Sequence, residues 1–348
     1  MMCDTFIRKL RLLLDVFLII MLLVMKVSIV IPTLNEEKTL PGLLESIKIQ
    51  DFDDYEVIIA DAKSTDKTRE IAHNFGCRVV DGGRPAAGRN AGAAVANGDF
   101  LFFLDADVIL PPGFIRNVYD EMQDRYIDIA TCEIKPLSDF RLDKVIHRMM
   151  NLAVVLNLWV DPKAFGFCIF VTKRLFNRVN GFDETIYVAE DNDFVKRASV
   201  CRTLRYLNSA YLMVSSRRFE KEGRFAYMKK GIKLNLYRTF MGEIRNNGVV
   251  KYEFAAFDKI DNDLDSNFLD KIERQLLKIE KKSKLFMINA RVKRSKNEKI
   301  DTRQLRPQLN EYDHLVKELD RYLSRRERRK QRLRKLADIF KPSCGGIT

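Results

Sequence analysis

Apolar runs of strand length alternate with helical segments between Lys26 and Val108, and this alternation constrains the fold of the 348-residue chain most strongly. Strands are predicted at 26–32, 55–61, 77–81 and 99–108, and helices at 36–49, 64–75 and 84–98. The first run is apolar at nearly every position, as in a strand that is covered on both faces. This βαβα order predicts an α/β fold with a Rossmann-like, mostly parallel sheet and helices on both faces.

The same pattern continues to a domain boundary that we place near Phe257. Helices are predicted at 111–122 (with proline in the first turn), about 142–159, 190–200 and 224–244, and strands at 127–136, at the start of 166–184 and at 249–254. An acidic stretch at 258–267 follows the boundary, and the composition then changes. The chain therefore divides into an apolar N-terminal extension (1–25), an α/β domain (26–257) and a charged, mainly helical C-terminal extension (258–348).

The positive charge of the chain is concentrated in its C-terminal part. The formal net charge is +13, and residues 251–348 hold 26 Lys/Arg against 16 Asp/Glu. The basicity must therefore be explained in the extension and not in the main domain. The six cysteines form no C-x-x-C pair and the three histidines are scattered, so neither a zinc site nor a disulfide framework is indicated, and a reducing cytosol fits.

The first 25 residues have three interpretations. They contain a run that resembles a signal anchor, but Asp15 leaves only 16–25 uninterrupted, shorter than the ~20 residues of a membrane span. Lys26 then leads directly into a predicted core strand without a linker. A true start at Met25, an N-terminal anchor and a packed extra helix therefore stand as alternatives.

Two carboxylates, Asp105 and Asp107, follow the apolar run at 100–104. If the strand continued through them, both side chains would project from one face. Ligands of open α/β sheets bind beyond the carboxyl ends of strands, and a carboxylate pair there suits a divalent cation such as Mg²⁺ or Mn²⁺ that also bridges a diphosphate. A polar turn without a ligand is the alternative for an isolated D-x-D.

Polar residues also follow the first two predicted strands. Asn35 and Glu36 follow the first, where they either cap the next helix or face a ligand. Asp61 ends the second, where it is placed to accept hydrogen bonds from a nucleotide base, and Ser64 and Asp66 are candidate N-caps of the helix that follows.

Residues 83–94 are rich in Gly and Ala and contain Arg84 and Arg89. Small residues let the backbone approach either a ligand or the sheet closely, and both interpretations stand. The segment has neither the G-x-G-x-x-G nor the P-loop spacing, so a dinucleotide site and a P-loop are not indicated.

Three acidic residues, Glu190, Asp191 and Asp193, open the helix predicted at 190–200. Acidic residues in a first turn interact favourably with the helix dipole, which is sufficient reason for them. The functional alternative is that one carboxylate removes a proton from an acceptor hydroxyl.

Six segments occur in the order and spacing typical of family 2 glycosyltransferases, which are inverting enzymes of the GT-A fold. The segments are VSIVIPTLNEEKTLPGLLESI, DAKSTDKT, GRNAGA, DADV, GFDE and EDNDF. Each is weak alone, but the six in order are specific. The chain resembles this family from residue 27 to about 257, and the resemblance implies the GT-A fold and an inverting sugar transfer.

The resemblance also implies a role for each candidate residue. The nucleoside of a UDP-, GDP- or dTDP-linked sugar would be bound by Pro32, Thr33, Asn35, Glu36 and Asp61, with Arg89 close to it. Asp105 would lie near the ribose and the metal, and Asp107 would be a metal ligand. Asp191 would be the catalytic base, with Glu190 beside it at the acceptor. The base activates the hydroxyl while the cation stabilises the departing diphosphate.

The chain departs from the family's processive members because it lacks a Q-x-x-R-W motif and a pair of C-terminal membrane helices. Both absences favour a single addition over polymerisation. Arg217 and Arg218 stand near the position of the missing motif and are candidate contacts of the diphosphate.

Two basic segments, 227–240 and 324–340, combine cations with apolar residues and suit an anionic membrane surface, which would serve a lipid-linked or surface-glycan acceptor. For the second, a solvated or coiled-coil-like helix is equally consistent. Nucleic acid is disfavoured, because no RRM, KH or zinc-knuckle signature is present. A cytoplasmic enzyme of cell-envelope glycan synthesis, peripheral at the inner face of the membrane, is the leading interpretation. The alternatives are a nucleotidyltransferase of similar fold and a non-catalytic protein that binds membrane or nucleic acid through its extension.

Overall fold

The computed structural model describes residues 26–217, 243–245, 266–295 and 300–339. By their internal contacts these residues fall into two units, of which the first holds 26–139, 157–216 and 243–245 and the second holds the rest. The predictions for 1–25, for most of the helix at 224–244, for the strand at 249–254 and for the boundary at Phe257 lie outside the described residues.

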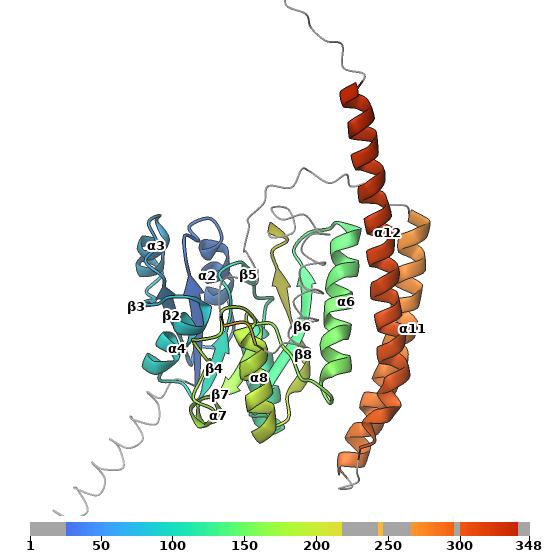
Figure 1. The fold of residues 1–348 in the computed structure, drawn as a ribbon. Coiled ribbons are helices and arrows are strands. Elements are labelled where there is room, and N and C mark those ends of the chain that lie inside the picture. Colours follow the sequence, from blue (N-terminus) through green and yellow to red (C-terminus); the bar gives the residue numbers. More distant parts are fainter. Residues whose placement is uncertain (1–25, 218–242, 246–265, 296–299, 340–348) are drawn as a thin grey trace, which may run out of the picture. The chain divides into compact units, whose positions relative to one another are not determined.

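The first unit is built on an eight-stranded mixed sheet of order β3-β2-β1-β4-β7-β6-β8-β5 (Figure 1). Its strands are β1 (Val27–Thr33), β2 (Tyr55–Asp61), β3 (Arg78–Asp81), β4 (Phe100–Phe103), β5 (Val108–Ile109), β6 (Ile129–Pro136), β7 (Ile169–Thr172) and β8 (Arg205–Val214). Strands β1 to β4 pair in parallel, as predicted, and β6 is parallel to β8. Strand β7 is antiparallel to β4 and β6, and β5 to β8. Strand β8 was not predicted.

Helices surround this sheet at α2 (Leu40–Lys48), α3 (Thr68–Asn74), α4 (Pro85–Val95), α5 (Phe114–Asp124), α7 (Lys173–Arg178) and α8 (Glu190–Cys201). Residues 27–31 of β1 are fully buried, so both faces of the central strand are covered. Helix α4 packs tightly on β1, because a Cβ added at Gly92 would lie 2.3 Å from Val30 Cγ1. Close packing on the sheet therefore accounts for the small residues of α4.

Several predicted helix ends are wrong, including the start of the helix predicted at 36–49, since α2 begins at Leu40. Helix α3 begins at Thr68 with Lys67 as N-cap, so neither Ser64 nor Asp66 caps it. The predicted prolines precede α5, whose N-cap is Gly113 in a left-handed conformation with φ of 72°. Helix α4 ends at Val95 and not at residue 98, because the backbone becomes extended at the next residue.

The second unit contains α6 (Arg141–Asn157), α11 (Ser266–Ser295), the 3₁₀ turn η1 (Thr302–Leu305) and α12 (Arg306–Ile339) (Figure 1). Helices α11 and α12 lie antiparallel, since the ring of Phe268 stacks on Tyr322 and Lys282 pairs with Glu311 at 2.6 Å. The buried residues of α11 recur at spacings of three and four: Leu269, Ile272, Leu276, Ile279, Ser283, Phe286 and Ala290. This is coiled-coil spacing, so the predicted helical extension includes a coiled-coil-like hairpin.

Helix α6 belongs with this hairpin. The Arg148 guanidinium donates to both carboxylate oxygens of Glu280 at 2.6 Å, and the Tyr312 hydroxyl donates to the Met149 carbonyl at 3.1 Å. An element inside the sequence range 26–257 therefore packs with the C-terminal helices. Among the helices that the structure describes, none combines the length and apolar character needed to cross a membrane.

Candidate active site

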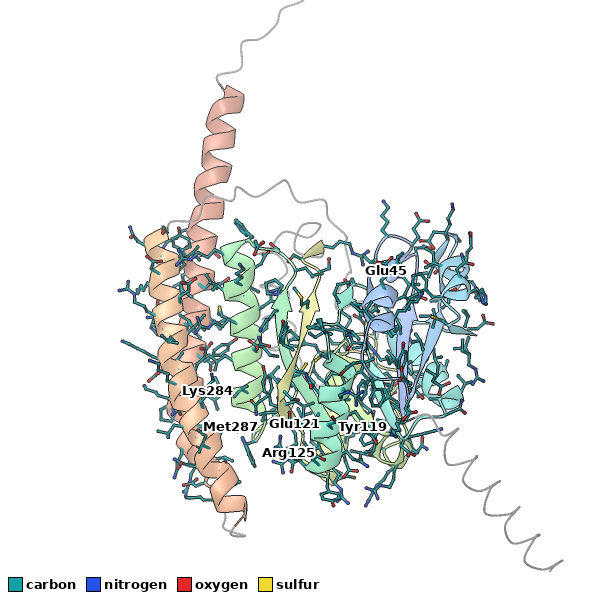
Figure 2. All side chains as sticks on the ribbon, turned by 180° about the vertical axis from the view of Figure 1, so that it is seen from behind. Glu45, Tyr119, Glu121, Arg125, Lys284 and Met287 are labelled. Atoms are coloured by element: carbon teal, nitrogen blue, oxygen red, sulfur yellow. The ribbon has the colours of Figure 1, made fainter. Side chains whose placement is uncertain are left out.

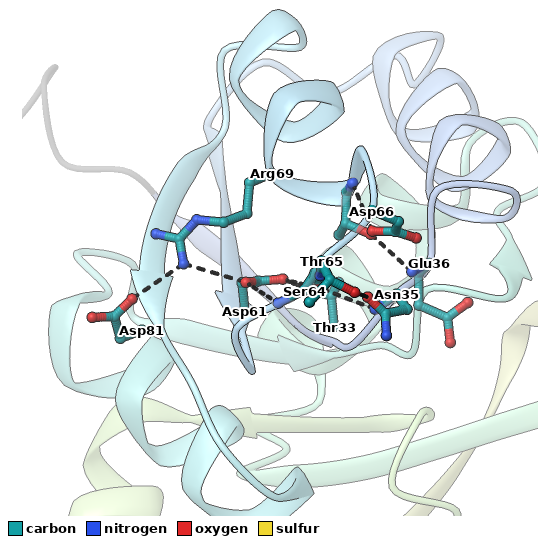
Figure 3. A network of polar contacts seen from close by, with 10 residues as sticks. Thr33, Asn35, Glu36, Asp61, Ser64, Thr65, Asp66, Arg69 and Asp81 are labelled. Atoms are coloured by element: carbon teal, nitrogen blue, oxygen red, sulfur yellow. Dashed lines mark hydrogen bonds and ion pairs between the residues drawn. The ribbon is translucent and has the colours of Figure 1, made fainter.

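The ends of β1 and β2 carry a network of polar contacts around Asp61 (Figure 3). The Asp61 side chain is fully buried. Its Oδ1 accepts from the Thr33 hydroxyl at 3.1 Å and the Ser64 hydroxyl at 2.6 Å, and its Oδ2 accepts from Ser64 N at 3.0 Å and from Arg69 at 3.3 Å. Four donors occupy the four acceptor positions of a carboxylate. A base N–H group can bind here only if one of these donors moves aside.

The loop that follows β1 is locked to the loop that follows β2. Asn35 has a φ of 56°, a left-handed conformation that Asn tolerates better than most residues. Its N–H donates to Ser64 Oγ at 2.8 Å, and its Oδ1 accepts from Thr65 N at 2.8 Å. Glu36 N donates to Thr68 Oγ1 at 2.8 Å. The structure therefore gathers Thr33, Asn35, Glu36 and Asp61 at one sheet edge, and Pro32 lies half-buried in β1.

The prediction that Asp105 and Asp107 continue a strand is wrong. Strand β4 ends at Phe103, and both aspartates lie in the turn that leads to β5. The turn is fixed at its far side, because Ser215 N donates to the Asp107 carbonyl at 2.9 Å. Asp107 is 7% exposed and the Asp105 side chain 18%. The turn keeps both carboxylates at the carboxyl end of β4, where a ligand site was predicted.

A buried arginine joins this turn to the start of α8. Arg89 projects from α4, and its side chain is 4% exposed. It forms ion pairs with Asp105 at 3.1 Å and with Glu190 at 2.8 Å. Burial alone would lower the pKa of Arg89, but the charges of Asp105, Glu190 and Asp191 outweigh burial and leave it raised. Arg89 thus pairs with two of the predicted site carboxylates, and its pKa also responds to the charge of a third, Asp191.

Glu190 and Asp191 are the first two residues of α8. They follow Ala189, whose φ of 65° is uncommon for a residue with a Cβ atom. Asp191 accepts hydrogen bonds from Gly166 N at 2.8 Å and from Asn192 N at 2.7 Å. Desolvation, followed by the charge of Glu190, raises the pKa of Asp191 to about 6, although Arg89 opposes the rise. A carboxylate with such a pKa near neutrality can accept a proton.

Gly166 is a site residue that sequence reasoning missed. Besides its hydrogen bond to Asp191, a Cβ at this position would lie 2.6 Å from Arg89 Nη2. The loop before β7 therefore comes close to both the base candidate and the buried arginine, and a side chain at this position would require the Arg89 guanidinium to shift. The one sequence signal was an isolated glycine between two phenylalanines, Phe165 and Phe167.

The turn that leads into α8 is held by two further residues that the sequence did not single out. The Asn90 side chain of α4 donates to the Phe182 carbonyl and accepts from Phe182 N, both at 2.9 Å. Arg197 of α8 donates to the Gly181 carbonyl at 2.8 Å and pairs with Asp193 at 2.7 Å. Asp193 is thus engaged in an i,i+4 ion pair within α8. Arg84 lies at the same turn and donates to the Glu184 carbonyl at 2.7 Å.

Two predicted contacts are not placed in the site. Arg217 belongs to the second unit, and Arg218 lies outside the described residues. Within the described ranges, no group of three or more His, Cys, Asp or Glu side chains is arranged to hold a metal ion by itself. The donor chemistry of Asp105 and Asp107 nevertheless suits Mg²⁺ or Mn²⁺, since these ions commonly take one or two carboxylates and complete their shell with water and phosphate oxygens.

Comparisons with known proteins relate part of the chain to a known family. Residues 28–175 match the model described as glycosyl transferase family 2. Poly(ribitol-phosphate) beta-N-acetylglucosaminyltransferase TarS of Staphylococcus aureus is 26% identical over 209 residues, which are 55% of this chain and 34% of that protein. GalNAc(5)-diNAcBac-PP-undecaprenol beta-1,3-glucosyltransferase of Campylobacter jejuni is 29% identical over 244 residues, 66% of this chain and 75% of that protein. This chain thus spans about a third of the length of TarS.

Solved structures with a similar fold include S. aureus TarS 1-349 in complex with UDP-GlcNAc, at 23% identity and a TM-score of 0.46 over 55% of this chain and 58% of that one. The mannosyltransferase PcManGT of Pyrobaculum calidifontis, in complex with GDP-Man and Mn²⁺, has 19% identity and a TM-score of 0.45 over 60% and 64%. Residues 28–175 of the present chain thus match glycosyl transferase family 2, and the first unit, which holds most of them, is built on a mixed sheet with helices around it.

Proposed function

We propose that this protein transfers a hexose-like sugar from a nucleotide sugar to an acceptor hydroxyl, with inversion and with the help of a divalent cation. The observation that carries the proposal is the Arg89 cluster, in which Asp105, Glu190 and Asp191 converge at the carboxyl end of β4 in a family 2 glycosyltransferase. A nucleotide-binding side and an acceptor side would meet at this arginine.

Asp191 is the proposed base. Its raised pKa of about 6 leaves it ionised at neutral pH but basic enough to take a proton from the acceptor as the hydroxyl attacks. The hydrogen bond from Gly166 N fixes one carboxylate oxygen, and Glu190 is held beside it by Arg89. Attack on the face opposite the leaving diphosphate, in one displacement, inverts the anomeric carbon.

The nucleoside is proposed to lie against Pro32, Thr33, Asn35, Glu36 and Asp61. These residues are gathered at the ends of β1 and β2, which supports one binding surface. Arg89 Nε is buried and has no hydrogen-bond acceptor within the described part of the chain, which leaves one donor for an oxygen of a bound ligand. Arg217 and Arg218 stay proposed contacts of the diphosphate.

A divalent cation, when bound with the donor, would stabilise the charge that develops on the diphosphate. Asp107 is the proposed ligand, with Asp105 between the metal and the ribose. Asp105 also pairs with Arg89, so the same carboxylate would connect the cation to the acceptor-side cluster. The structure of PcManGT contains Mn²⁺ with its nucleotide sugar, which agrees with this choice of ion.

The donor is proposed to carry UDP, GDP or dTDP, and UDP is the first to test because TarS was crystallised with UDP-GlcNAc. The acceptor is proposed to be a glycan, either lipid-linked or at the cell surface. The names of two relatives point to such acceptors, a poly(ribitol-phosphate) and an undecaprenol-linked glycan. We propose a single addition in the cytoplasm, at the inner face of the membrane, as one step of cell-envelope glycan synthesis.

Asp107→Ala is expected to abolish metal-dependent binding of the nucleoside diphosphate. For the wild-type chain, a nucleoside diphosphate at a hundredfold excess over its Kd should stabilise the fold by about 2.7 kcal/mol, seen as a higher Tm with Mn²⁺ or Mg²⁺ and not with EDTA. The variant should show no metal-dependent shift. Asp124→Ala, an exposed aspartate at the end of α5, is the matched control. A shift that persists in Asp107→Ala, or no shift with any nucleotide for the folded wild type, would exclude this metal site.

Gly166→Ala is expected to lower the rate of sugar transfer roughly a hundredfold, because the added methyl group would displace either the Arg89 guanidinium or the Gly166 backbone, whose N–H donates to Asp191. Steady-state kinetics should show the loss in kcat more than in the donor KM. Gly76→Ala, at a surface turn with no atom within 4 Å of the added Cβ, tests whether backbone strain alone has this effect. Wild-type kcat in Gly166→Ala would contradict the assigned contact.

A further inference from the structure

Helix α11 exposes an apolar and basic surface on the side opposite its buried residues. This surface, which we call the α11 outer face, consists of Arg274, Leu277, Lys278, Lys281, Lys284, Leu285 and Ile288. Three large aliphatic side chains are exposed on it, Leu277 by 43%, Leu285 by 61% and Ile288 by 56%. Single exposed leucines are ordinary, but three on one helix face within twelve residues form a patch.

The position of this face follows from helix geometry. At 100° per residue, Leu277 and Ile288 lie within 20° of each other, and Leu285 and the four cations lie within about 60° of Lys281. The buried residues Ile272, Leu276, Ile279, Ser283 and Phe286 lie on the opposite side. From Arg274 to Ile288 the face runs for about 21 Å. Figure 2 labels Lys284 and Met287 on this helix.

The charge of the α11 outer face is of one sign. Between Arg274 and Ile288 the only acidic residue is Glu280, and its carboxylate is bound by Arg148 of α6 at 2.6 Å. Lys282, at 140° from Leu277, turns toward α12 and pairs with Glu311. No ion pair joins Lys278, Lys281 or Lys284 to another residue in the described part of the chain. The lysines of this face therefore add to a single positive surface.

We propose that the α11 outer face binds an anionic lipid surface, with its leucines and isoleucine inserted at the level of the headgroups and its lysines on the lipid phosphates. Aliphatic residues flanked by Lys and Arg are the composition of helices that lie in the plane of a membrane interface. A second copy of the same face would place cations against cations, which disfavours self-association. Phosphate groups of a nucleic acid would pair with the lysines but would leave three aliphatic side chains in water.

The α11 outer face consists of other residues than the basic segments at 227–240 and 324–340, and its binding to lipid does not depend on sugar transfer. Binding should need both components of the face, the aliphatic side chains for insertion and the lysines for attraction, and it should weaken as salt screens the charges.

The test is sedimentation of the full chain with phosphatidylcholine vesicles, with and without phosphatidylglycerol. One variant replaces Lys278, Lys281 and Lys284 by Gln, and a second replaces Leu277, Leu285 and Ile288 by Gln. The matched control replaces three exposed lysines elsewhere, Lys48, Lys196 and Lys317, by Gln, so that net charge falls equally. We expect the wild type and the control to bind the anionic vesicles, and the α11 lysine variant to partition roughly a hundredfold more weakly.

Each outcome decides the proposal. Weaker binding of both α11 variants with an unchanged control supports it. Binding of the α11 variants equal to that of the control overturns it and assigns lipid binding to another segment. A wild-type dimer in light scattering that the aliphatic variant loses also overturns it, in favour of a second copy as the occupant. Nucleoside-diphosphate binding measured on the same variants should be unchanged, so failure here is separate from failure of the proposed enzyme function.

Discussion

Asp191→Asn is expected to reduce the rate of sugar transfer about 10²–10⁴-fold, the range over which general bases contribute, while leaving the Kd for the donor nearly unchanged. The amide oxygen can accept the hydrogen bond of Gly166, although the amide NH₂ group cannot accept the one that Asn192 N donates to the carboxylate, so the fold should persist with one hydrogen bond fewer. The amide cannot take the proton of the acceptor hydroxyl. Steady-state transfer assays together with donor binding by calorimetry separate these two effects.

The pH dependence of the wild-type enzyme should report the same carboxylate. Because the pKa of Asp191 is raised to about 6, the group is protonated and inactive below that pH and becomes a competent base above it. We therefore expect kcat/KM to rise with pH through about 6 and then level off. Asp191→Asn should remove this acidic limb from the residual activity.

The free energy of unfolding should fall over the same pH range in which kcat/KM rises. A carboxyl whose folded pKa is raised contributes stability when protonated, and that contribution is lost as the pH rises through about 6. Asp191→Asn has no such charge to lose, so at pH above 6 its Tm should equal or exceed that of the wild type. A variant that is both inactive and more stable would be typical of a residue kept for function.

Asp193→Asn is the matched control, because it makes the same change in the same helical turn while its carboxylate faces Arg197. It should retain transfer. The base assignment would be wrong if Asp191→Asn kept wild-type turnover. Retained formation of a pyrophosphate bond from a nucleoside triphosphate would instead indicate a nucleotidyltransferase.

Strands β1 to β4, β6 and β7 overlap with predicted strands, and the pattern is clearest where the strand is buried. Strand β1 and the second half of β2 appear in the sequence as short apolar runs because both faces are covered, and their order with α2 and α3 fixes parallel pairing. Strand β8 contains Asn208 and Ser209, both exposed, which break its apolar pattern. It is a strand because its backbone pairs with β6, a non-local contact that periodicity does not encode.

The candidate site was predicted by residue type but not by geometry. The motifs contained Asp105, Glu190 and Asp191, but their common partner Arg89 was assigned to the nucleoside side alone. Asp105 and Glu190 follow Arg89 in the sequence by 16 and 101 positions, and both contact its guanidinium. Only the tertiary fold brings these residues together. Gly166 was missed for the same reason. The case for it rests on its closeness to Arg89, because a side chain at this position would displace the arginine, and the sequence does not show that the two residues are neighbours.

Arg89→Leu is expected to destabilise the fold by about 3–5 kcal/mol at neutral pH, because it breaks two largely buried ion pairs, with Asp105 and with Glu190. It should also raise the pKa of Asp191 further, since Arg89 is the main group that lowers it. Arg89→Lys keeps the charge but lacks the planar fork that reaches two carboxylates, so an intermediate loss is expected. Urea unfolding at several pH values measures all three effects.

The pH dependence of this loss tests its electrostatic cause. Without Arg89 the folded-state pKa of Asp191 rises further, so the penalty from its charge is present at neutral pH and shrinks as the pH falls and Asp191 takes up a proton. Adding Glu190→Gln to Arg89→Leu removes the negative charge that Arg89 balanced and should recover part of the stability, whereas Glu190→Gln alone should not stabilise the wild type.

The control is Arg116→Leu, which breaks an exposed pair with Asp51 and should lower the free energy of unfolding by at most about 1 kcal/mol. If Arg89→Leu costs no more than this control, or if its cost does not depend on pH, the three carboxylates do not rely on Arg89, and the site is held by its backbone contacts alone.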